Sequence, residues 1–192
     1  MKIIGILGSA RDGGNTDLLM QEIMKGAVKE NEKRAATDGI NAKTYNLAKM
    51  NIGCCLGCES CRKNGGCVRN DDMKMLYEEL KNADAIVIGT PIYMGEMTGQ
   101  LKTFIDRCYA LKDAERNPLI PTGIKMAVVI TQGAPMPEHY AKTPERIEYI
   151  FSGLGCVSVG TVTAIGTHEK DDVLKDDTVL EKAREIGRQL TI

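Results

Sequence analysis

Five of the seven cysteines of this chain lie within fifteen residues, in the stretch GCCLGCESCRKNGGC from Gly53 to Cys67. Thiols at this density can form disulfides, bind zinc, bind an iron–sulfur cluster or act as redox groups. The N-terminal segment turns into Gly-Ser too early for a secretion signal, so we expect a cytoplasmic protein. Because cytosolic thiols stay reduced, metal ligands or redox groups are favoured over structural disulfides.

The spacing of these cysteines favours a 4Fe–4S cluster. Two residues separate Cys55 from Cys58 and Cys58 from Cys61, and Cys67 follows after five more. Iron–sulfur clusters take four thiolates, often three from a tight C-x2-C-x2-C run, whereas structural zinc usually takes two C-x2-C pairs with a longer insert. Zinc, redox thiols and a loop without metal stay open as alternatives. Because adjacent side chains point in different directions, Cys54 is expected to lie outside the ligand set.

Composition limits the remaining possibilities. With 192 residues and 43% hydrophobic content, the chain is long enough for one globular domain, residues 1–192, that carries the cysteine-rich loop at 53–70. A net charge of −1 argues against a nucleic-acid partner, which normally requires a basic excess. No apolar segment approaches the roughly 20 residues needed to cross a bilayer, so we expect no membrane association.

Short apolar segments alternate with amphipathic ones along the chain. The apolar segments predict strands at Lys2–Gly8, Ala42–Leu47, Asp84–Tyr93, Lys125–Gly133 and Cys156–Gly166. The amphipathic segments predict a helix from Asn15 onward and further helices at Asp71–Ala83, Gly99–Leu111, Pro144–Gly155 and Thr178–Leu190. This alternation predicts a parallel sheet with helices on both faces. Pro91 is expected to end the third strand.

The loop after the first strand, GSARDGGNTDLL, has the composition of a phosphate site. Ligands of such sheets bind beyond the carboxyl ends of the strands, where backbone N–H groups at a helix N-terminus attract anions. Ser9, Asn15 and Thr16 offer side-chain donors, and Arg11 offers a positive charge. The nucleotide-binding patterns that end in Gly-Lys-Ser/Thr or read G-x-G-x-x-G are absent. An ordinary tight turn that precedes a helix is the alternative.

The loops after the third and fourth strands can face the same crevice. Tyr93 and Met94 offer a flat ring and a thioether that could pack against a planar cofactor, and Gly95 allows a close backbone approach. The fourth strand ends in TQGAPMPEHY, which begins at Thr131. Core packing is the alternative for Tyr93 and Met94. His139 and His168 are interpreted as surface or loop residues.

Three motifs resemble those of known flavoproteins. GSARDGGNTDLL resembles the FMN-phosphate loop of NADPH-dependent FMN reductases, and TPIYMGEMTGQLKTFIDR is similar to the flavin-ring loop and helix of the same superfamily. CLGCESCRKNGGCVRNDDM resembles the cluster motif of the iron–sulfur flavoproteins, with Cys55, Cys58, Cys61 and Cys67 at matching positions. The resemblance spans about the first 135 residues and implies a flavodoxin-like three-layer sandwich whose five parallel strands have the order 2-1-3-4-5.

The resemblance also implies the cofactors, FMN and a 4Fe–4S cluster. The residues expected to bind FMN are Ser9, Arg11, Gly14, Asn15, Thr16, Pro91, Ile92, Tyr93, Met94, Gly95, Gln132 and Gly133. The chemistry would belong to the cofactors, and no side chain is assigned a catalytic role.

Electrons would pass from ferredoxin, or from NAD(P)H, to a small acceptor such as oxygen, peroxide or a quinone. The subunits would form a homo-oligomer, a dimer or a tetramer. Two alternatives stay open, an NAD(P)H-dependent FMN or quinone reductase without a cluster, and a non-catalytic flavin redox-sensing module.

Overall fold

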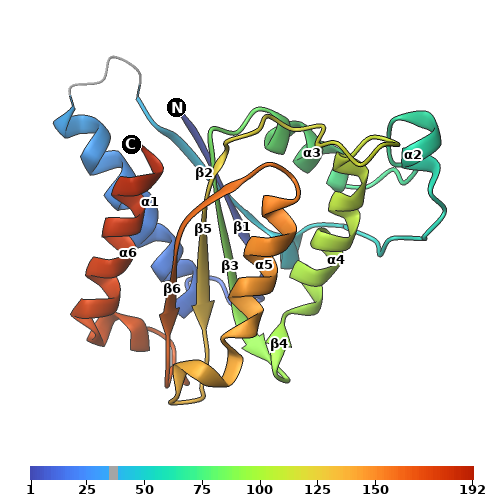
Figure 1. Cartoon of the computed structure of the whole chain (residues 1–192). Helices are drawn as coiled ribbons and strands as arrows, with labels where there is room; N and C mark the ends of the chain where they lie inside the picture. The colour runs from blue at the N-terminus through green and yellow to red at the C-terminus, as the bar shows by residue number, and fades with distance from the viewer. Residues whose placement is uncertain (35–38) are drawn as a thin grey trace.

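The computed structural model of the chain describes residues 1–34 and 39–192 and contains the predicted parallel sheet (Figure 1). Its principal strands lie in the order β2-β1-β3-β5-β6 and are all parallel. They are β1 (Lys2–Leu7), β2 (Asn41–Asn46), β3 (Ala85–Tyr93), β5 (Lys125–Thr131) and β6 (Val157–Ala164). Counted without the short strand β4, this order is the predicted 2-1-3-4-5, so the predicted fold class is confirmed.

Helices cover both faces of the sheet. On one face lie α1 (Asn15–Lys33) and α6 (Asp177–Leu190), and on the other α3 (Met73–Lys81), α4 (Gly99–Arg107) and α5 (Lys142–Ser152). Successive strand residues point to opposite faces, so Ile3 of β1 packs with α1 and α6, whereas Ile4 packs with the other three helices. Among the described residues, no helix is long and apolar enough to cross a membrane.

The predicted break at Pro91 is wrong, because β3 runs through Pro91 and ends at Tyr93. β1 pairs with β3 only as far as Gly89, whereas β5 continues alongside, with Thr131 opposite Pro91. From Thr90 onward, β3 therefore has a parallel neighbour on one side only, and a proline without an N–H group is tolerated at such an open edge. The strand thus carries its last residues past the end of β1.

Several short elements have no counterpart in the predictions. The two-residue strand β4 (Glu96–Met97) turns back on the end of β3, and α2 (Ser60–Asn64) lies within the cysteine-rich loop. The described residues also form four 3-10 turns: η1 (Leu47–Lys49), η2 (Cys108–Leu111), η3 (Pro137–Tyr140) and η4 (Asp172–Lys175). The predicted helix Gly99–Leu111 is α-helical only to Arg107 and continues as η2. Buried Cys108 and Cys156 both belong to the core.

Helices α1 and α6 pack backbone against backbone at two glycines. A Cβ atom at Gly26 would lie 2.2 Å from the carbonyl oxygen of Arg184, and one at Gly187 would lie 2.0 Å from that of Ile23. Neither obstacle is a flexible side chain, so any larger residue must push the helices apart. This constraint fixes the outer layer against which β1 and β3 pack.

We therefore predict that Gly187→Ala lowers the free energy of unfolding by about 2 kcal/mol or more, as overpacked cores do. Gly99→Ala is the matched control, because a Cβ atom there meets nothing within 4 Å and alanine favours the first turn of α4. Urea unfolding followed by circular dichroism measures both. Equal stability of the two variants would contradict the packing described here.

Candidate functional site

A cavity of about 250 Å³ lies at the carboxyl ends of β1, β3 and β5. We call it the strand-edge cavity. It is lined by Ser9, Arg11, Gly14, Asn15, Thr16, Pro91, Ile92, Tyr93, Thr131, Gln132, Gly133, Thr167 and His168. All of the residues expected to bind FMN are among them except Met94 and Gly95. Loops that are far apart in the sequence thus meet at one edge of the sheet, as the parallel topology requires.

The first loop is held by its own side chains. Ser9 is buried, and its Oγ accepts the N–H of Arg11 at 3.1 Å. Thr16 and Thr131 share a buried hydroxyl–hydroxyl hydrogen bond of 2.7 Å, and Asn15 Nδ2 donates to the carbonyl of Glu169 at 2.8 Å. The side chains of Asn15 and Thr16 therefore join the loop to its neighbours instead of standing free as donors. Gly14, which precedes α1, supplies no side-chain cap, so the N-terminus of the helix and the charge of Arg11 give this end of the cavity its positive character.

Gln132 brings an unpaired acceptor to the cavity. Its side chain is buried, and Nε2 donates to the carbonyl oxygens of Ala134 at 3.2 Å and Met136 at 2.9 Å. These two bonds fix the amide, while Oε1 has no hydrogen-bond partner among the described residues. A buried acceptor without a partner is costly unless a ligand donor reaches it. The lining thus suits a ligand that carries both a phosphate, for Arg11 and the start of α1, and an N–H group, for Gln132 Oε1.

Thr131, Thr167 and His168 also line the cavity, although none of them was predicted to bind FMN. Thr167 and His168 follow β6, and the available signal was positional, since the last strand ends at the same edge as the others. The N–H group of His168 donates to Asp172 Oδ2 at 3.0 Å. Hydrogen bonds from Lys175 and from the N–H groups of this turn lower the pKa of Asp172 to about 2, so its carboxylate is charged at neutral pH and holds the turn.

Met94 and Gly95 form the turn between β3 and β4 and do not line the cavity. Both have positive φ angles, 50° and 86°, and the Met94 side chain is fully exposed. The turn is fastened through Glu96, which accepts a hydrogen bond from Thr143 Oγ1 at 2.8 Å and pairs with Arg146. The thioether therefore projects outward, beside the mouth of the cavity, in a position where a neighbouring molecule could meet it.

A second cavity, of about 280 Å³, is formed by the cysteine-rich loop and the end of α4. We call it the cysteine cavity. Cys55, Cys58, Cys61 and Cys67 all line it, together with Leu56, Gly57, Glu59, Val68, Arg69, Asp106, Arg107, Tyr109 and Ala110. Cys54 does not, and its sulfur lies 3.9 Å from Thr103 Oγ1 on the side of α4. Cys54 is exposed and lies outside this cavity.

The thiols of this loop are free and are not drawn together in the structure. In the part of the chain that the structure describes, no three His, Cys, Asp or Glu side chains are gathered closely enough to hold a metal ion. The four-cysteine ligand set therefore stays a prediction. The backbone nevertheless bends around the cavity, with Gly57 and Glu59 at positive φ angles of 63° and 55°, and the N–H of Gly57 points to Cys55 Sγ at 3.5 Å. The four thiols that line the cavity are donors of the kind that iron–sulfur clusters take.

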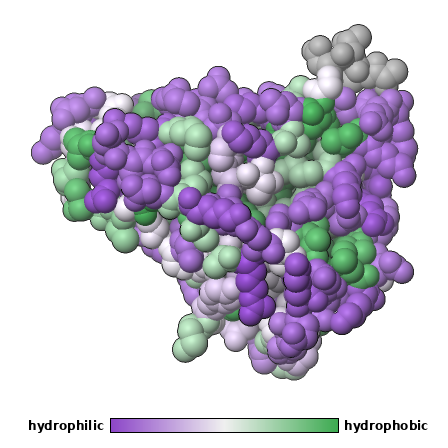
Figure 2. Space-filling model, turned by 180° about the vertical axis from the view of Figure 1, so that it is seen from behind, coloured by the Kyte–Doolittle hydropathy of each residue, from purple (hydrophilic) through white to green (hydrophobic). Residues whose placement is uncertain are grey.

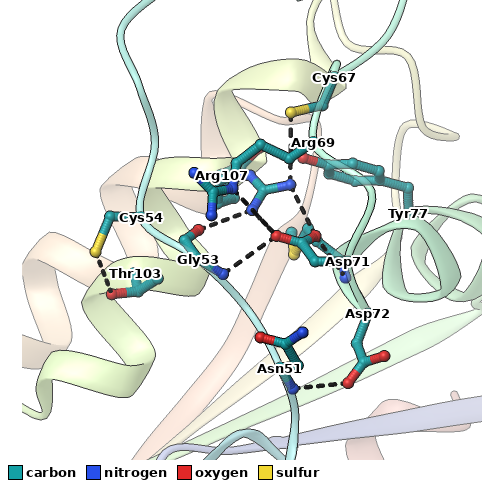
Figure 3. A network of polar contacts seen from close by, with 11 residues as sticks. Asn51, Gly53, Cys54, Cys67, Arg69, Asp71, Asp72, Tyr77, Thr103 and Arg107 are labelled. Carbon is teal, nitrogen blue, oxygen red and sulfur yellow. Dashed lines mark hydrogen bonds and ion pairs between the residues drawn. The ribbon is translucent and has the colours of Figure 1, made fainter.

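A buried ion pair ties the two ends of the loop to α4 (Figure 3). Arg107 Nη1 donates to Asp71 Oδ2 at 2.6 Å and to the carbonyl of Gly53 at 2.8 Å, while Nη2 donates to Asp71 Oδ1 at 3.0 Å and to Cys67 Sγ at 3.4 Å. Asp71 also accepts the N–H groups of Gly53 and Met73, at 3.1 and 3.2 Å. The acid therefore binds the first N–H group of α3 and also closes the loop.

Burial and pairing determine the charge states of this network. Hydrogen bonds from Arg107, with further help from Gly53, lower the pKa of Asp71 to about 2 despite its burial. Burial raises the pKa of Tyr77 far above its usual value, and its hydroxyl donates to the carbonyl of Arg107 at 2.9 Å. The phenol is therefore neutral, and Asp71 meets two positive charges here, that of Arg107 and that of Arg69, whose Nε lies 3.4 Å from Asp71 Oδ2.

The two cavities lie at opposite ends of α4. Thr98, which precedes α4, caps it and donates from Oγ1 to the carbonyl of Gly8 at 2.7 Å, beside the strand-edge cavity. Arg107, the last residue of α4, lines the cysteine cavity. A helix of 9 residues is about 14 Å long, so this helix sets the spacing between the two cavities within one chain.

Comparison with known proteins agrees with this architecture. The family model of NADPH-dependent FMN reductases matches residues 1–170. An iron–sulfur flavoprotein of Methanocaldococcus jannaschii is 30% identical over 200 residues, which cover 99% of this chain and 95% of the relative. An iron–sulfur flavoprotein of Archaeoglobus fulgidus is 30% identical, with 99% and 79% covered. A structure of an FMN-dependent NADH-azoreductase of Bacillus anthracis in complex with FMN superposes with a TM-score of 0.70 at 16% identity, covering 100% of this chain and 99% of that one.

A parallel sheet of this order, with a polar cavity at its carboxyl edge, defines a flavodoxin-like protein. The chain belongs to the NADPH-dependent FMN reductase family and, within it, to the iron–sulfur flavoproteins. It is therefore a flavin oxidoreductase.

The lowered pKa of Asp71 predicts an acid-sensitive contribution to stability. Because the pKa is below that of an unfolded aspartate, the contribution is complete above about pH 4 and is lost as the pH falls toward 2. The difference in unfolding free energy between wild type and Asp71→Asn should therefore shrink by about 2 kcal/mol between pH 5 and pH 2. Urea unfolding of both proteins after treatment with a chelator, which removes metal release as a variable, measures this. A difference that does not change with pH would contradict the ion pair.

Proposed function

We propose that FMN binds in the strand-edge cavity and that a 4Fe–4S cluster binds on Cys55, Cys58, Cys61 and Cys67. The observation that carries the proposal is the separation of the cysteines. The four with cluster spacing line one cavity, and the adjacent Cys54 lies outside it. When bound, the cluster exchanges one electron and the flavin one or two, so the pair connects a one-electron donor to a two-electron acceptor.

The side chains around the strand-edge cavity bind and orient the flavin. Arg11 and the N-terminus of α1 hold the phosphate. Gln132, whose amide is already fixed, presents Oε1 to an N–H group of the ring system. Tyr93 packs its aromatic ring beside the cofactor from the end of β3. Each of these residues binds or orients, and none is assigned a proton transfer.

A ferredoxin-like protein donates the electrons in this proposal, and a small molecule such as oxygen, peroxide or a quinone accepts them. The subunits assemble as a homo-oligomer, a dimer or a tetramer. Two features support assembly. The cavities are separated by the length of α4, and some apolar side chains lie exposed among polar ones at the edge of the molecule where the cysteine-rich loop projects (Figure 2). Leu56 and Val68 of this loop are 63% and 58% exposed, as expected of residues that a partner covers.

A cluster-free reductase is the second candidate. It is favoured by the match to NADPH-dependent FMN reductases and by the absence of gathered metal ligands in the described part of the chain. In this case NAD(P)H reduces the flavin directly. Anaerobic purification separates the two candidates, because bound cluster adds a broad brown absorption with about four iron and four sulfide per chain. Yellow protein without iron, reduced by NADPH, would support the second candidate.

The phosphate assignment predicts a loss of affinity in Arg11→Gln. A hydrogen bond to a charged group is worth about 1.5–3 kcal/mol, so FMN should bind about tenfold more weakly or worse. Lys29→Gln removes the same charge from an exposed position on α1 and should bind FMN normally. Fluorescence titration with FMN gives both affinities. Equal affinities for the two variants would mean that Arg11 does not contact the phosphate.

The cluster assignment predicts a pattern across five serine variants. Changing Cys55, Cys58, Cys61 or Cys67 should reduce iron and brown absorption while FMN stays bound, because the cofactors occupy separate cavities. Cys54→Ser should keep wild-type iron and is the matched control. If Cys54→Ser loses iron and Cys55→Ser keeps it, the register of the ligands is wrong. Wild-type spectra in all five variants would reject the cluster.

A further inference from the structure

Arg107 occupies an unusual position for a charged residue. It ends α4, its side chain is 1% exposed, and its guanidinium has four hydrogen bonds (Figure 3). One of them leads to a sulfur atom, Sγ of Cys67, at 3.4 Å. The other three hydrogen bonds go to Asp71 and to the carbonyl of Gly53. The hydrogen bond to Cys67 is therefore not required to neutralise the buried carboxylate of Asp71.

Stability alone explains this arrangement poorly. Removing an arginine and an acid from water is costly, and a well-packed apolar pair often gives equal or greater stability. The network also leaves Nε of Arg107 without a hydrogen-bond partner among the described residues. A chain that needed only to attach its loop could do so with apolar side chains, yet α2 has no buried residue.

The position of Cys67 explains what the guanidinium contributes. Cys55 and Cys58 precede α2 and Cys61 lies near its start, on the outgoing arm of the loop, whereas Cys67 follows α2 on the returning arm. A ligand on a separate arm has to be placed independently, and Arg107 holds the carbonyl of Gly53 and the sulfur of Cys67 on the same planar group. The group therefore fixes the distance between the two arms.

The charge of this group also acts on the sulfur. A guanidinium is always protonated, and a hydrogen bond from it favours negative charge on its acceptor. Arg69 lines the same cavity, but its Nε faces Asp71. Asp71, behind Arg107, carries the opposite charge and works against the same effect. The proposed ligand Cys67 therefore has the positive charge of Arg107 beside it, and the negative charge of Asp71 lies on the other side of Arg107.

We propose that Arg107 is the positioning residue of the iron–sulfur site, which sets the place of Cys67 and raises the reduction potential of the bound cluster. The inference rests on the proposed function, because it requires a cluster on Cys67. It assigns a role to a residue that is not itself a ligand.

Two single variants break the same ion pair but test opposite charges. Arg107→Met removes the positive charge and all four donors, whereas Asp71→Asn removes the negative charge and leaves the Arg107 contact to Cys67. After anaerobic reconstitution with Fe²⁺ and sulfide, the potential of the cluster should fall in Arg107→Met and rise in Asp71→Asn. Iron should be lost to a chelator about 10–100-fold faster in Arg107→Met than in wild type. Potential shifts of the same sign in both variants, or no shifts, would overturn the proposal. An ion pair with a purely structural role would not shift the potential in opposite directions when its two charges are removed in turn.

Further variants separate position from charge and from misfolding. Arg107→Lys keeps the charge but not the planar group, so its potential should stay nearer to wild type while iron is lost faster. If Arg107→Met does not fold, as judged by circular dichroism and FMN retention, the double variant Asp71→Asn/Arg107→Met removes both buried charges. It should lose iron faster than Asp71→Asn alone, and equal rates would overturn the proposal. Wild-type protein that holds no iron would instead refute the proposed function.

Discussion

The buried pair of Arg107 and Asp71 is the interaction on which the cysteine-rich loop depends. This loop is rich in glycine, cysteine and charged residues, and its helix α2 has no buried side chain. It cannot fold around a core of its own. The pair attaches it instead at its two ends, through the backbone of Gly53 and the sulfur of Cys67. A single arginine at the end of a well-packed helix thus gives shape to a segment whose composition alone would leave it unrestrained.

The remaining site depends on a more general constraint, the common direction of the strands. Parallel strands bring their carboxyl ends to one edge, so loops separated by more than a hundred residues meet without any special sequence signal. The hydrogen bond between Thr16 and Thr131 illustrates this, since it links the first helix to the fourth principal strand. Open ends of strands also leave polar groups free of ladder bonds, and Gln132 shows how such a position yields a fixed acceptor inside a cavity.

Local patterns predicted the elements better than the contacts between them. The strand order and most of the strand-edge lining follow from apolar runs, glycine-rich turns and the resemblance of three motifs. The prediction that Pro91 ends the third strand is wrong because the effect of this proline depends on where β1 stops. That depends on tertiary structure and cannot be seen in the local sequence. His168 lies in the lining because a turn after β6 folds over Gly133, and nothing in its own neighbours indicates this. From the local sequence, Arg107 cannot be told from an ordinary helix residue, because its hydrogen-bond partners lie 36 to 54 positions away in the chain.

The way in which the cysteine-rich loop is attached bears on how this architecture could diversify. The loop places no buried residue in either core, although Cys67 packs against one of them. Its contacts with the rest of the molecule fall on α4, on Tyr109 of η2 and on Asp113 just beyond. A shorter plain turn between β2 and α3 would leave the sheet, its helices and the strand-edge cavity intact. The scaffold can therefore gain or lose the cysteine cavity by exchange of one surface segment. Because the strand-edge cavity would keep its lining, the two cavities can have separate evolutionary histories.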